Sequence, residues 1–209
     1  AVSSLLTRGV THTRAEWLAE AERCELAGSL VTCESIVQVT IGSGLDLADC
    51  ESIWREDATH CIARKQIHTA RAIFTHAATT FKADQDLWRD LAMLEKNHGS
   101  REKMLAVLHR AVEFCPEADH LWVLAAKEEF TAGNLDAARK IIAEAYKISP
   151  HSEQIWLAAA KIEQTDGKFE DAAGLLKLGR QKAGSGRVWM KSAILERQLK
   201  HHAQELALL

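Results

Sequence analysis

All six tryptophans of this 209-residue chain stand at nearly equal intervals along the sequence. They are Trp17, Trp54, Trp88, Trp122, Trp156 and Trp189, and the steps between them are 37, 34, 34, 34 and 33 residues. Tryptophan is a rare residue, so a regular spacing of every copy is not a chance pattern. A period near 34 residues is typical of stacked helix–turn–helix repeats. The spacing therefore predicts an elongated array of helix pairs.

Other residue types follow the same period. Glutamate stands seven residues after four of the tryptophans, at Glu95, Glu129, Glu163 and Glu196. Seven residues make about two helical turns, so tryptophan and glutamate share one helix face. Glycine stands eleven residues after four tryptophans, at Gly28, Gly99, Gly133 and Gly167. We expect the tryptophans and glutamates to pack the repeats together and the glycines to end helices in the left-handed conformation.

Each repeat is thus expected to contain a helix A with the tryptophan, a glycine turn and a helix B. The expected A helices are 14–27, 48–63, 84–97, 117–131, 151–165 and 187–199. The expected B helices are 30–41, 67–80, 100–114, 135–147 and 169–182. Small residues recur 23 positions after the tryptophan, at Ala77, Ala111, Ala145 and Gly179, and predict close helix contacts.

The predicted fold class is all-α, a right-handed solenoid of stacked antiparallel helix pairs with about five full repeats. We expect one array over residues 1–209, with units near 14–41, 48–80, 84–114, 117–147 and 151–182 and a partial unit at 187–209. Residues 1–8 and 202–209 resemble pieces of further B helices. The chain is therefore expected to be excised from a longer solenoid, and its apolar ends are expected to favour self-association.

Charge is distributed unevenly along the chain, although the net charge is only −3. Residues 1–63 hold 10 acidic and 4 basic residues, whereas residues 177–200 hold 7 basic and 1 acidic residue. The basic residues of this second stretch are Lys177, Arg180, Lys182, Arg187, Lys191, Arg197 and Lys200. They indicate either a solvated helix face or a contact with RNA or with an acidic partner.

The sequence contains no recognisable catalytic, metal or cofactor motif. The five cysteines form no C-x-x-C pair, which favours free and mostly buried thiols in a reducing compartment. The glycine-rich stretch 41–50 lacks the Lys-Ser or Lys-Thr pair of a phosphate-binding loop and is interpreted as a loop insertion. No cofactor and no enzymatic activity are expected.

The repeated glutamates favour a structural role, because a catalytic residue would not recur in every repeat. A buried carboxylate without a partner costs several kcal/mol, so each is expected to bind a neighbouring helix. Arg139 is the candidate partner of Glu129.

Three stretches carry a family resemblance: "LWRDLAMLEKNHG", "LWVLAAKEEFTAGNLDAARKII" and "IWLAAAKIEQTDGKFEDAAGLL". With "ARAIF" at 70–74, they resemble the HAT repeat, or half-a-TPR. Tetratricopeptide repeats proper are less similar, since their glycine and tyrosine positions in helix A are not matched.

The resemblance extends along almost the whole chain to the C-terminal HAT arrays of splicing scaffolds in the U5 small nuclear ribonucleoprotein. It implies a non-enzymatic scaffold that bridges the U5 and U4/U6 particles in the tri-snRNP through protein contacts and, in part, snRNA. It also implies a location in the nucleus, in nucleoplasm and nuclear speckles, without a membrane. The alternatives are a HAT scaffold of mRNA 3′-end cleavage or ribosome biogenesis, or RNA contact through residues 177–200.

Overall fold

The computed structural model describes residues 12–199, and its regular secondary structure over this range consists of eleven α-helices. This confirms the predicted all-α class. No helix among these residues is both long and apolar enough to cross a membrane. The stretches 1–8 and 202–209, predicted to be parts of further B helices, lie outside the described residues.

The helices follow the predicted order, and every helix begins and ends within two residues of its predicted bounds. The A helices are α2 (Arg14–Leu26), α4 (Leu47–Ala63), α6 (Gln85–His98), α8 (Asp119–Thr131), α10 (Glu153–Thr165) and α12 (Gly186–Gln198). The B helices are α3 (Leu30–Thr40), α5 (Ile67–Thr80), α7 (Arg101–Phe114), α9 (Leu135–Ile148) and α11 (Phe169–Lys182).

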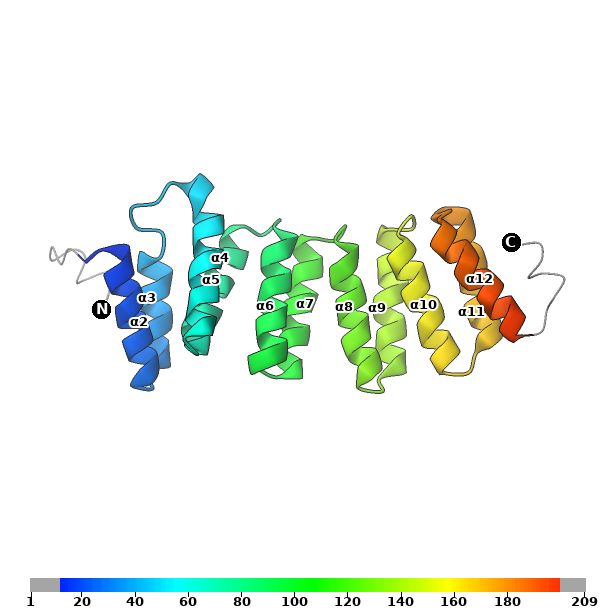
Figure 1. The fold of residues 1–209 in the computed structure, drawn as a ribbon, viewed down its shortest axis with the longest axis horizontal. Coiled ribbons are helices and arrows are strands. Elements are labelled where there is room, and N and C mark those ends of the chain that lie inside the picture. The colour runs from blue at the N-terminus through cyan, green and yellow to red at the C-terminus, as the bar shows by residue number, and fades with distance from the viewer. Residues whose placement is uncertain (1–11, 200–209) are drawn as a thin grey trace. The chain divides into compact units, whose positions relative to one another are not determined.

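The chain divides into two compact units, residues 1–107 (unit 1) and residues 108–209 (unit 2). In unit 1, α2 pairs with α3 and α4 with α5, and α5 also contacts α3 and α6 (Figure 1). In unit 2, α8 pairs with α9 and α10 with α11, while α10 contacts both α8 and α12 (Figure 1). That one array runs through both units stays a prediction.

The predicted glycine turns are left-handed at three of the four positions. Gly28, Gly133 and Gly167 have φ angles of 75°, 83° and 78°. Gly99 is different, with φ −114° and ψ −140°, so the prediction of a left-handed turn there is wrong. A Cβ atom at Gly99 would lie 2.9 Å from the carbonyl oxygen of Glu95, and it would also meet the Glu95 carboxylate. The last turn of α6 therefore lies too close to Gly99 to leave room for a side chain.

Small residues permit the close helix contacts that the period predicts. Ala77 and Ala145 are fully buried, in α5 and α9. Gly179 of α11 is also buried, and a Cβ atom there would lie 3.0 Å from Cβ of Trp156 and 3.3 Å from Cγ1 of Val188. The absence of a side chain at Gly179 thus lets α11 approach both α10 and α12.

The first interval of 37 residues is accommodated in the loop between α3 and α4, visible in Figure 1. The loop follows a helix and not a strand, which agrees with its interpretation as an insertion. Its first residue, Ile41, is buried, and the Ile41 carbonyl accepts hydrogen bonds from Nε of Arg14 and Nε1 of Trp54, each at 3.0 Å. The start of the loop is therefore fixed against α2 and α4.

A carboxylate from one repeat caps a helix of the next. Glu25 of α2 accepts hydrogen bonds from the backbone N–H groups of His68 and Thr69, at 2.9 and 2.8 Å. The Thr69 hydroxyl donates to the same carboxylate at 2.7 Å. These N–H groups belong to the first turn of α5, where they have no partner within the helix. Glu25 thus joins α2 to α5.

Candidate binding surfaces

The tryptophans pack the A helices and also bind the preceding connection. Five of the six are buried, with exposed fractions of 1–6%. Trp88, Trp122 and Trp156 each donate from Nε1 to the carbonyl six residues earlier, at distances of 2.9, 2.8 and 2.7 Å. These carbonyls belong to Lys82, Pro116 and Pro150, in the segments between a B helix and the next A helix. Each of these tryptophans therefore holds a connection against the start of its helix.

Trp189 departs from this role, because its side chain is 40% exposed. Trp156 is stacked against Tyr146 of α9, at 5.2 Å between ring centroids, and also contacts Gly179 of α11. Trp189 of α12 instead has the guanidinium of Arg180 over its ring, 5.3 Å from the centroid. The role of Trp189 in repeat packing stays a prediction.

The repeated glutamates form ion pairs across repeats in two cases. Glu163 of α10 accepts from Nε and Nη2 of Arg139 of α9, both at 2.8 Å. Glu95 of α6 accepts in the same way from Arg71 of α5, with 3.3 Å between Nη2 and Oε2. The Glu95 side chain is 4% exposed. In both pairs an arginine of helix B binds a glutamate 24 residues later, in the next helix A.

Arg139 therefore binds Glu163, and the predicted pair with Glu129 is wrong. Glu129 is half-buried and accepts a hydrogen bond from Nδ2 of Asn134 at 2.8 Å. Glu196 is also half-buried. The residues 24 positions before Glu129 and Glu196 are Leu105 and Ala172, so neither glutamate has an arginine in the equivalent position.

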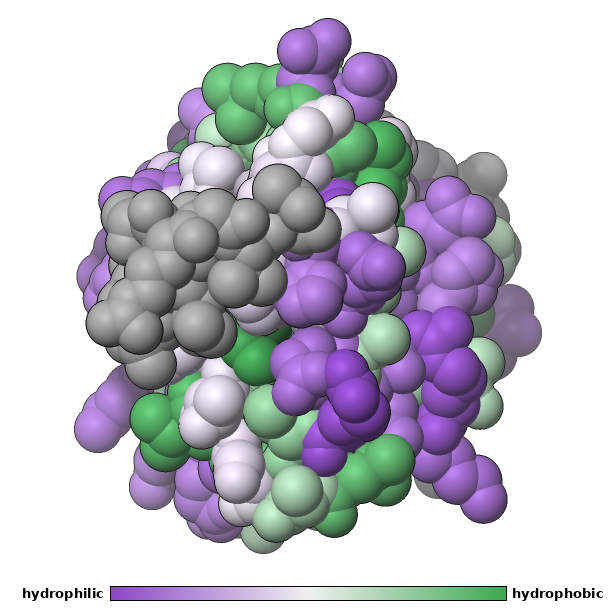
Figure 2. Space-filling model, turned by 90° about the vertical axis from the view of Figure 1, so that its left-hand side faces the viewer, coloured by the Kyte–Doolittle hydropathy of each residue, from purple (hydrophilic) through white to green (hydrophobic). Residues whose placement is uncertain are grey.

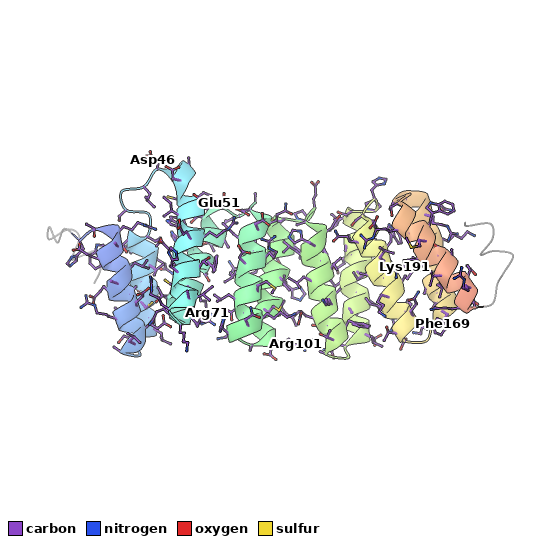
Figure 3. The ribbon with its side chains drawn as sticks, viewed as in Figure 1. Asp46, Glu51, Arg71, Arg101, Phe169 and Lys191 are labelled. Atoms are coloured by element: carbon purple, nitrogen blue, oxygen red, sulfur yellow. The ribbon has the colours of Figure 1, made fainter. Side chains whose placement is uncertain are left out.

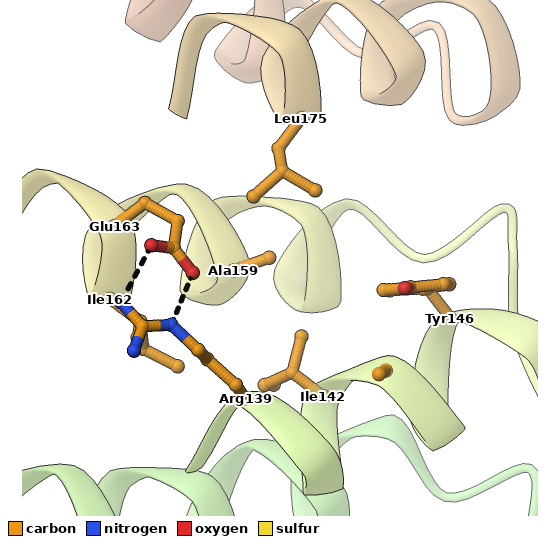
Figure 4. A pocket seen from close by; sticks show the side chains of 8 residues that line it. Arg139, Ile142, Tyr146, Ala159, Ile162, Glu163 and Leu175 are labelled. Atoms are coloured by element: carbon orange, nitrogen blue, oxygen red, sulfur yellow. Dashed lines mark hydrogen bonds and ion pairs between the residues drawn. The ribbon is translucent and has the colours of Figure 1, made fainter. Parts of the chain in front are cut away.

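A cavity of about 180 Å³ lies between α9, α10 and α11 (Figure 4). Its lining includes Ile142, Tyr146, Ala159 and Leu175, and the ion pair of Arg139 and Glu163 closes one side. Both charged groups of the cavity are satisfied by each other, and the remaining lining is largely apolar. The cavity therefore offers no free charge for a ligand.

A second, larger groove of about 270 Å³ lies between α8 and α10. Its lining is apolar except for Thr131 and two lysines, and consists of Val123, Ala126, Lys127, Phe130, Thr131, Ala158, Lys161 and Ile162. Lys127 and Lys161 are exposed and occupy the same position in consecutive repeats, five residues after Trp122 and Trp156. The 34-residue spacing of these two lysines is the signal in the sequence that marks them as equivalent.

The basic stretch 177–200 is shared between α11 and α12. Lys177, Lys182, Lys191 and Arg197 are exposed, and Figure 3 labels Lys191 on α12. Arg187 forms an ion pair with Glu153 of α10, at 2.6 Å, and Arg180 covers Trp189. Lys200 lies outside the described residues. The stretch is thus not a uniform row of unpaired cations.

The described part of the chain contains no cluster of side chains suited to binding a metal ion. Within residues 12–199, no three or more His, Cys, Asp or Glu side chains lie close enough to hold a metal ion. All five cysteines are free, and four of them are buried. Burial and the neighbouring Glu22 carboxylate raise the pKa of Cys61 to about 12, so this thiol stays protonated at neutral pH.

Three comparisons with known proteins agree with this geometry. The tetratricopeptide repeat family matches residues 119–162, which contain α8, α9 and the first part of α10. The chain is 39% identical over 114 residues to pre-mRNA-splicing factor prp1 of Schizosaccharomyces pombe. It is 42% identical over 88 residues to human pre-mRNA-processing factor 6. These matches cover 54% and 42% of this chain, and 13% and 9% of the two relatives.

Among solved structures, a tetratricopeptide repeat protein from Parabacteroides merdae is similar with a TM-score of 0.51. It is 14% identical, and the match covers 93% of this chain and 77% of that protein. This similarity concerns the fold alone. The sequence matches confirm the resemblance to splicing factors.

Proposed function

We propose that this chain is a non-enzymatic scaffold segment that holds protein partners within a splicing particle. The observation that carries the proposal is the identity of 39–42% to two splicing factors over a region built from tetratricopeptide-type helix pairs. Stacked helix pairs present long faces on which extended partners bind. The apolar groove between α8 and α10 supplies such a face within unit 2.

We further propose that these partners belong to the U5 and U4/U6 particles, which the scaffold joins in the tri-snRNP. The location follows from this role: the nucleus, within nucleoplasm and nuclear speckles. The buried, protonated thiol of Cys61 and the paired charges of Arg139 and Glu163 support a structural use of these groups in place of catalysis. No cofactor is required for such a role.

Affinity purification tests this proposal. The tagged 209-residue chain is incubated with nuclear extract, and the bound proteins are identified by mass spectrometry. We expect proteins of the U5 and U4/U6 particles to be enriched over a tag-only control. Recovery of mRNA 3′-end cleavage factors or ribosome-assembly factors without U5 proteins would contradict the proposal and favour another HAT scaffold.

A second candidate function is RNA contact through α11 and α12. The exposed Trp189 ring, with exposed cations at Lys182, Lys191 and Arg197, favours it, because single-stranded RNA combines stacking on aromatic rings with phosphate contacts. Binding of labelled oligouridine at low and moderate salt tests it. We expect affinity to fall steeply with salt and with a Trp189→Ala, Lys191→Glu variant. Equal or undetectable binding by both proteins would remove this candidate.

A further inference from the structure

The A helices of unit 2 share an exposed face that carries positive charge without negative charge. We call this the open face: the residues one, two, five, eight and nine positions after Trp122, Trp156 and Trp189. Each of these residues is half-buried or exposed. None is acidic, and four are basic, namely Lys127, Lys161, Lys191 and Arg197. The other members include Val123, Phe130, Met190 and Ile194, so the open face alternates cations with apolar side chains.

The open face is not a general property of the repeat. The same five positions in the A helices of unit 1 hold three basic residues and also four acidic residues, Glu22, Glu25, Glu56 and Asp90. In that unit Glu22 binds Arg64, and Asp90 binds Arg55 at 3.2 Å. Three of these four acidic residues, Glu22, Glu25 and Asp90, thus have partners within the fold. The positive charge of the open face in unit 2 requires a separate explanation.

Three lysines of the open face have no carboxylate to bind within the described part of the chain. No ion pair there engages Lys127, Lys161 or Lys191. The residues three and four positions away from each of them on the same helix include no aspartate or glutamate. Lys127 and Lys161 stand at the groove between α8 and α10, whose other lining groups are apolar apart from Thr131. Unpaired ammonium groups beside an apolar groove provide charge complementarity for a ligand that is both apolar and acidic.

We propose that the open face of unit 2 binds an acidic–apolar segment of a partner protein. An apolar side chain of that segment enters the groove between α8 and α10, and flanking aspartate or glutamate side chains bind Lys127, Lys161 and Lys191. The proposal rests on the proposed scaffold function in one respect, namely that the partner is a protein. RNA fits the groove less well, because Phe130 is its single aromatic ring and is half-buried, so bases have no exposed ring to stack on.

Selection from a phage-displayed library of short random peptides tests the proposal without knowledge of the partner. The 209-residue chain and a Lys127→Glu, Lys161→Glu variant are used as separate baits. A Lys140→Glu, Lys147→Glu variant is the matched control, because both lysines are exposed on α9 and the change in net charge is the same. Circular dichroism and melting temperature establish that all three proteins are equally folded.

We expect the wild-type chain and the control to select peptides rich in Asp or Glu together with Leu or Phe. The Lys127→Glu, Lys161→Glu variant is expected to lose these peptides, with affinity for a synthetic wild-type-selected peptide reduced about tenfold or more. In an Ala158→Trp variant the tryptophan side chain fills the groove. This variant is expected to bind the same peptide more weakly. Failure to select peptides, or selection of the same peptides by all baits, would overturn the proposal.

Labelled oligouridine is measured with the same proteins. RNA binding that is lost in the Lys127→Glu, Lys161→Glu variant but kept in the control, without acidic peptide selection, would assign the open face to RNA and overturn the proposal. These outcomes are independent of the nuclear-extract experiment. Splicing proteins recovered equally by wild type and by the Lys127→Glu, Lys161→Glu variant would leave the scaffold function standing and refute only the open-face site.

Discussion

Lys65 occupies the position that glycine holds in the other turns, eleven residues after Trp54. Its φ angle is 64°, in the left-handed region, close to the 75° of Gly28. The hydrogen bonds also correspond: the N–H groups of Lys65 and Gly28 each donate to the carbonyl three residues earlier, at 2.9 Å. A side chain in this conformation costs roughly 1 kcal/mol relative to glycine. The turn between α4 and α5 thus has the left-handed conformation although it contains lysine in place of glycine.

We expect the Lys65→Gly variant to be more stable than wild type by about 0.5–1 kcal/mol, because glycine relieves the left-handed strain. Urea unfolding followed by circular dichroism measures the change. The matched control is Lys140→Gly, because Lys140 is an exposed lysine within α9. We expect this substitution to lower the free energy of unfolding by about 1 kcal/mol. A Lys65→Gly variant that is less stable than wild type would show that the side chain contributes more than the strain costs.

Burial lowers the pKa of His76 below its usual 6.5, and its ring lies 5.0 Å from that of Trp54. In the unfolded chain His76 binds a proton near pH 6.5, whereas the folded protein resists protonation. The free energy of unfolding should therefore fall as pH drops below about 6.5, and the loss is complete once pH is below the folded pKa.

Comparison with His76→Gln isolates this effect, because glutamine does not titrate. We expect the free energy of unfolding of wild type to fall more than that of His76→Gln between about pH 7 and about pH 5. If the free energy of unfolding depended on pH in the same way in both proteins, His76 would not contribute to the pH dependence of stability.

At this scale the period indicated where the turn glycines and the packing tryptophans stand, because such positions follow from helix geometry alone. It did not predict the extended backbone of Gly99 or the exposure of Trp189. Gly99 is set by the close approach of Glu95, and the environment of Trp189 differs in having the Arg180 guanidinium over the ring. Both depend on neighbours that a period does not specify.

At the scale of elements, α5, α9 and α11 each contact their own A helix and the next one, as α9 contacts both α8 and α10. The sequence predicted the helices to within two residues. It did not specify which A helix the arginine of a B helix would reach. Arg71 and Arg139 both reach forward, to Glu95 and Glu163. The recurrence of an arginine 24 residues before a glutamate is a signal for this pairing that becomes meaningful once the packing is known.

A double-mutant cycle with Arg139→Ala and Glu163→Ala measures this coupling between α9 and α10. We expect an interaction energy of about 1–3 kcal/mol, because the pair is bidentate and largely buried. The control cycle uses Arg139 and Asp136, within α9, where the Asp136 side chain is 92% exposed, and should give less than about 0.5 kcal/mol. Equal couplings in the two cycles would refute a specific role of Glu163 in joining the helices.

At the scale of the molecule, exposed apolar groups differ between the two units. In unit 1 they include Leu26 and Val31, at 75% and 77% exposure, beside the turn between α2 and α3. Figure 2 views this end of unit 1, where apolar patches in green are separated by hydrophilic residues in purple. Self-association through apolar ends stays a prediction, which the molecular mass in solution tests.

In unit 2 the exposed apolar groups Met190 and Ile194 instead belong to the open face and stand beside cations. The sequence suggested partner contact through the basic stretch 177–200, and the structure adds Lys127 and Lys161, which lie well outside it. Lysines on a helix are commonly solvated, so only the groove between α8 and α10 distinguishes these two. The absence of acidic residues from the open face is visible once the positions that form this face are known.

Zero-length crosslinking tests most directly whether the chain is a splicing scaffold that binds acidic segments through unit 2. A carbodiimide joins a lysine amine to a carboxylate only where the two groups are in contact. The chain is treated with it in nuclear extract, and crosslinked peptides are identified by mass spectrometry. We predict crosslinks from Lys127, Lys161 or Lys191 to aspartate or glutamate residues of U5 or U4/U6 proteins. The scaffold function and the open-face site would be contradicted if such proteins were crosslinked only through Lys140 or Lys147, or if no splicing protein were crosslinked.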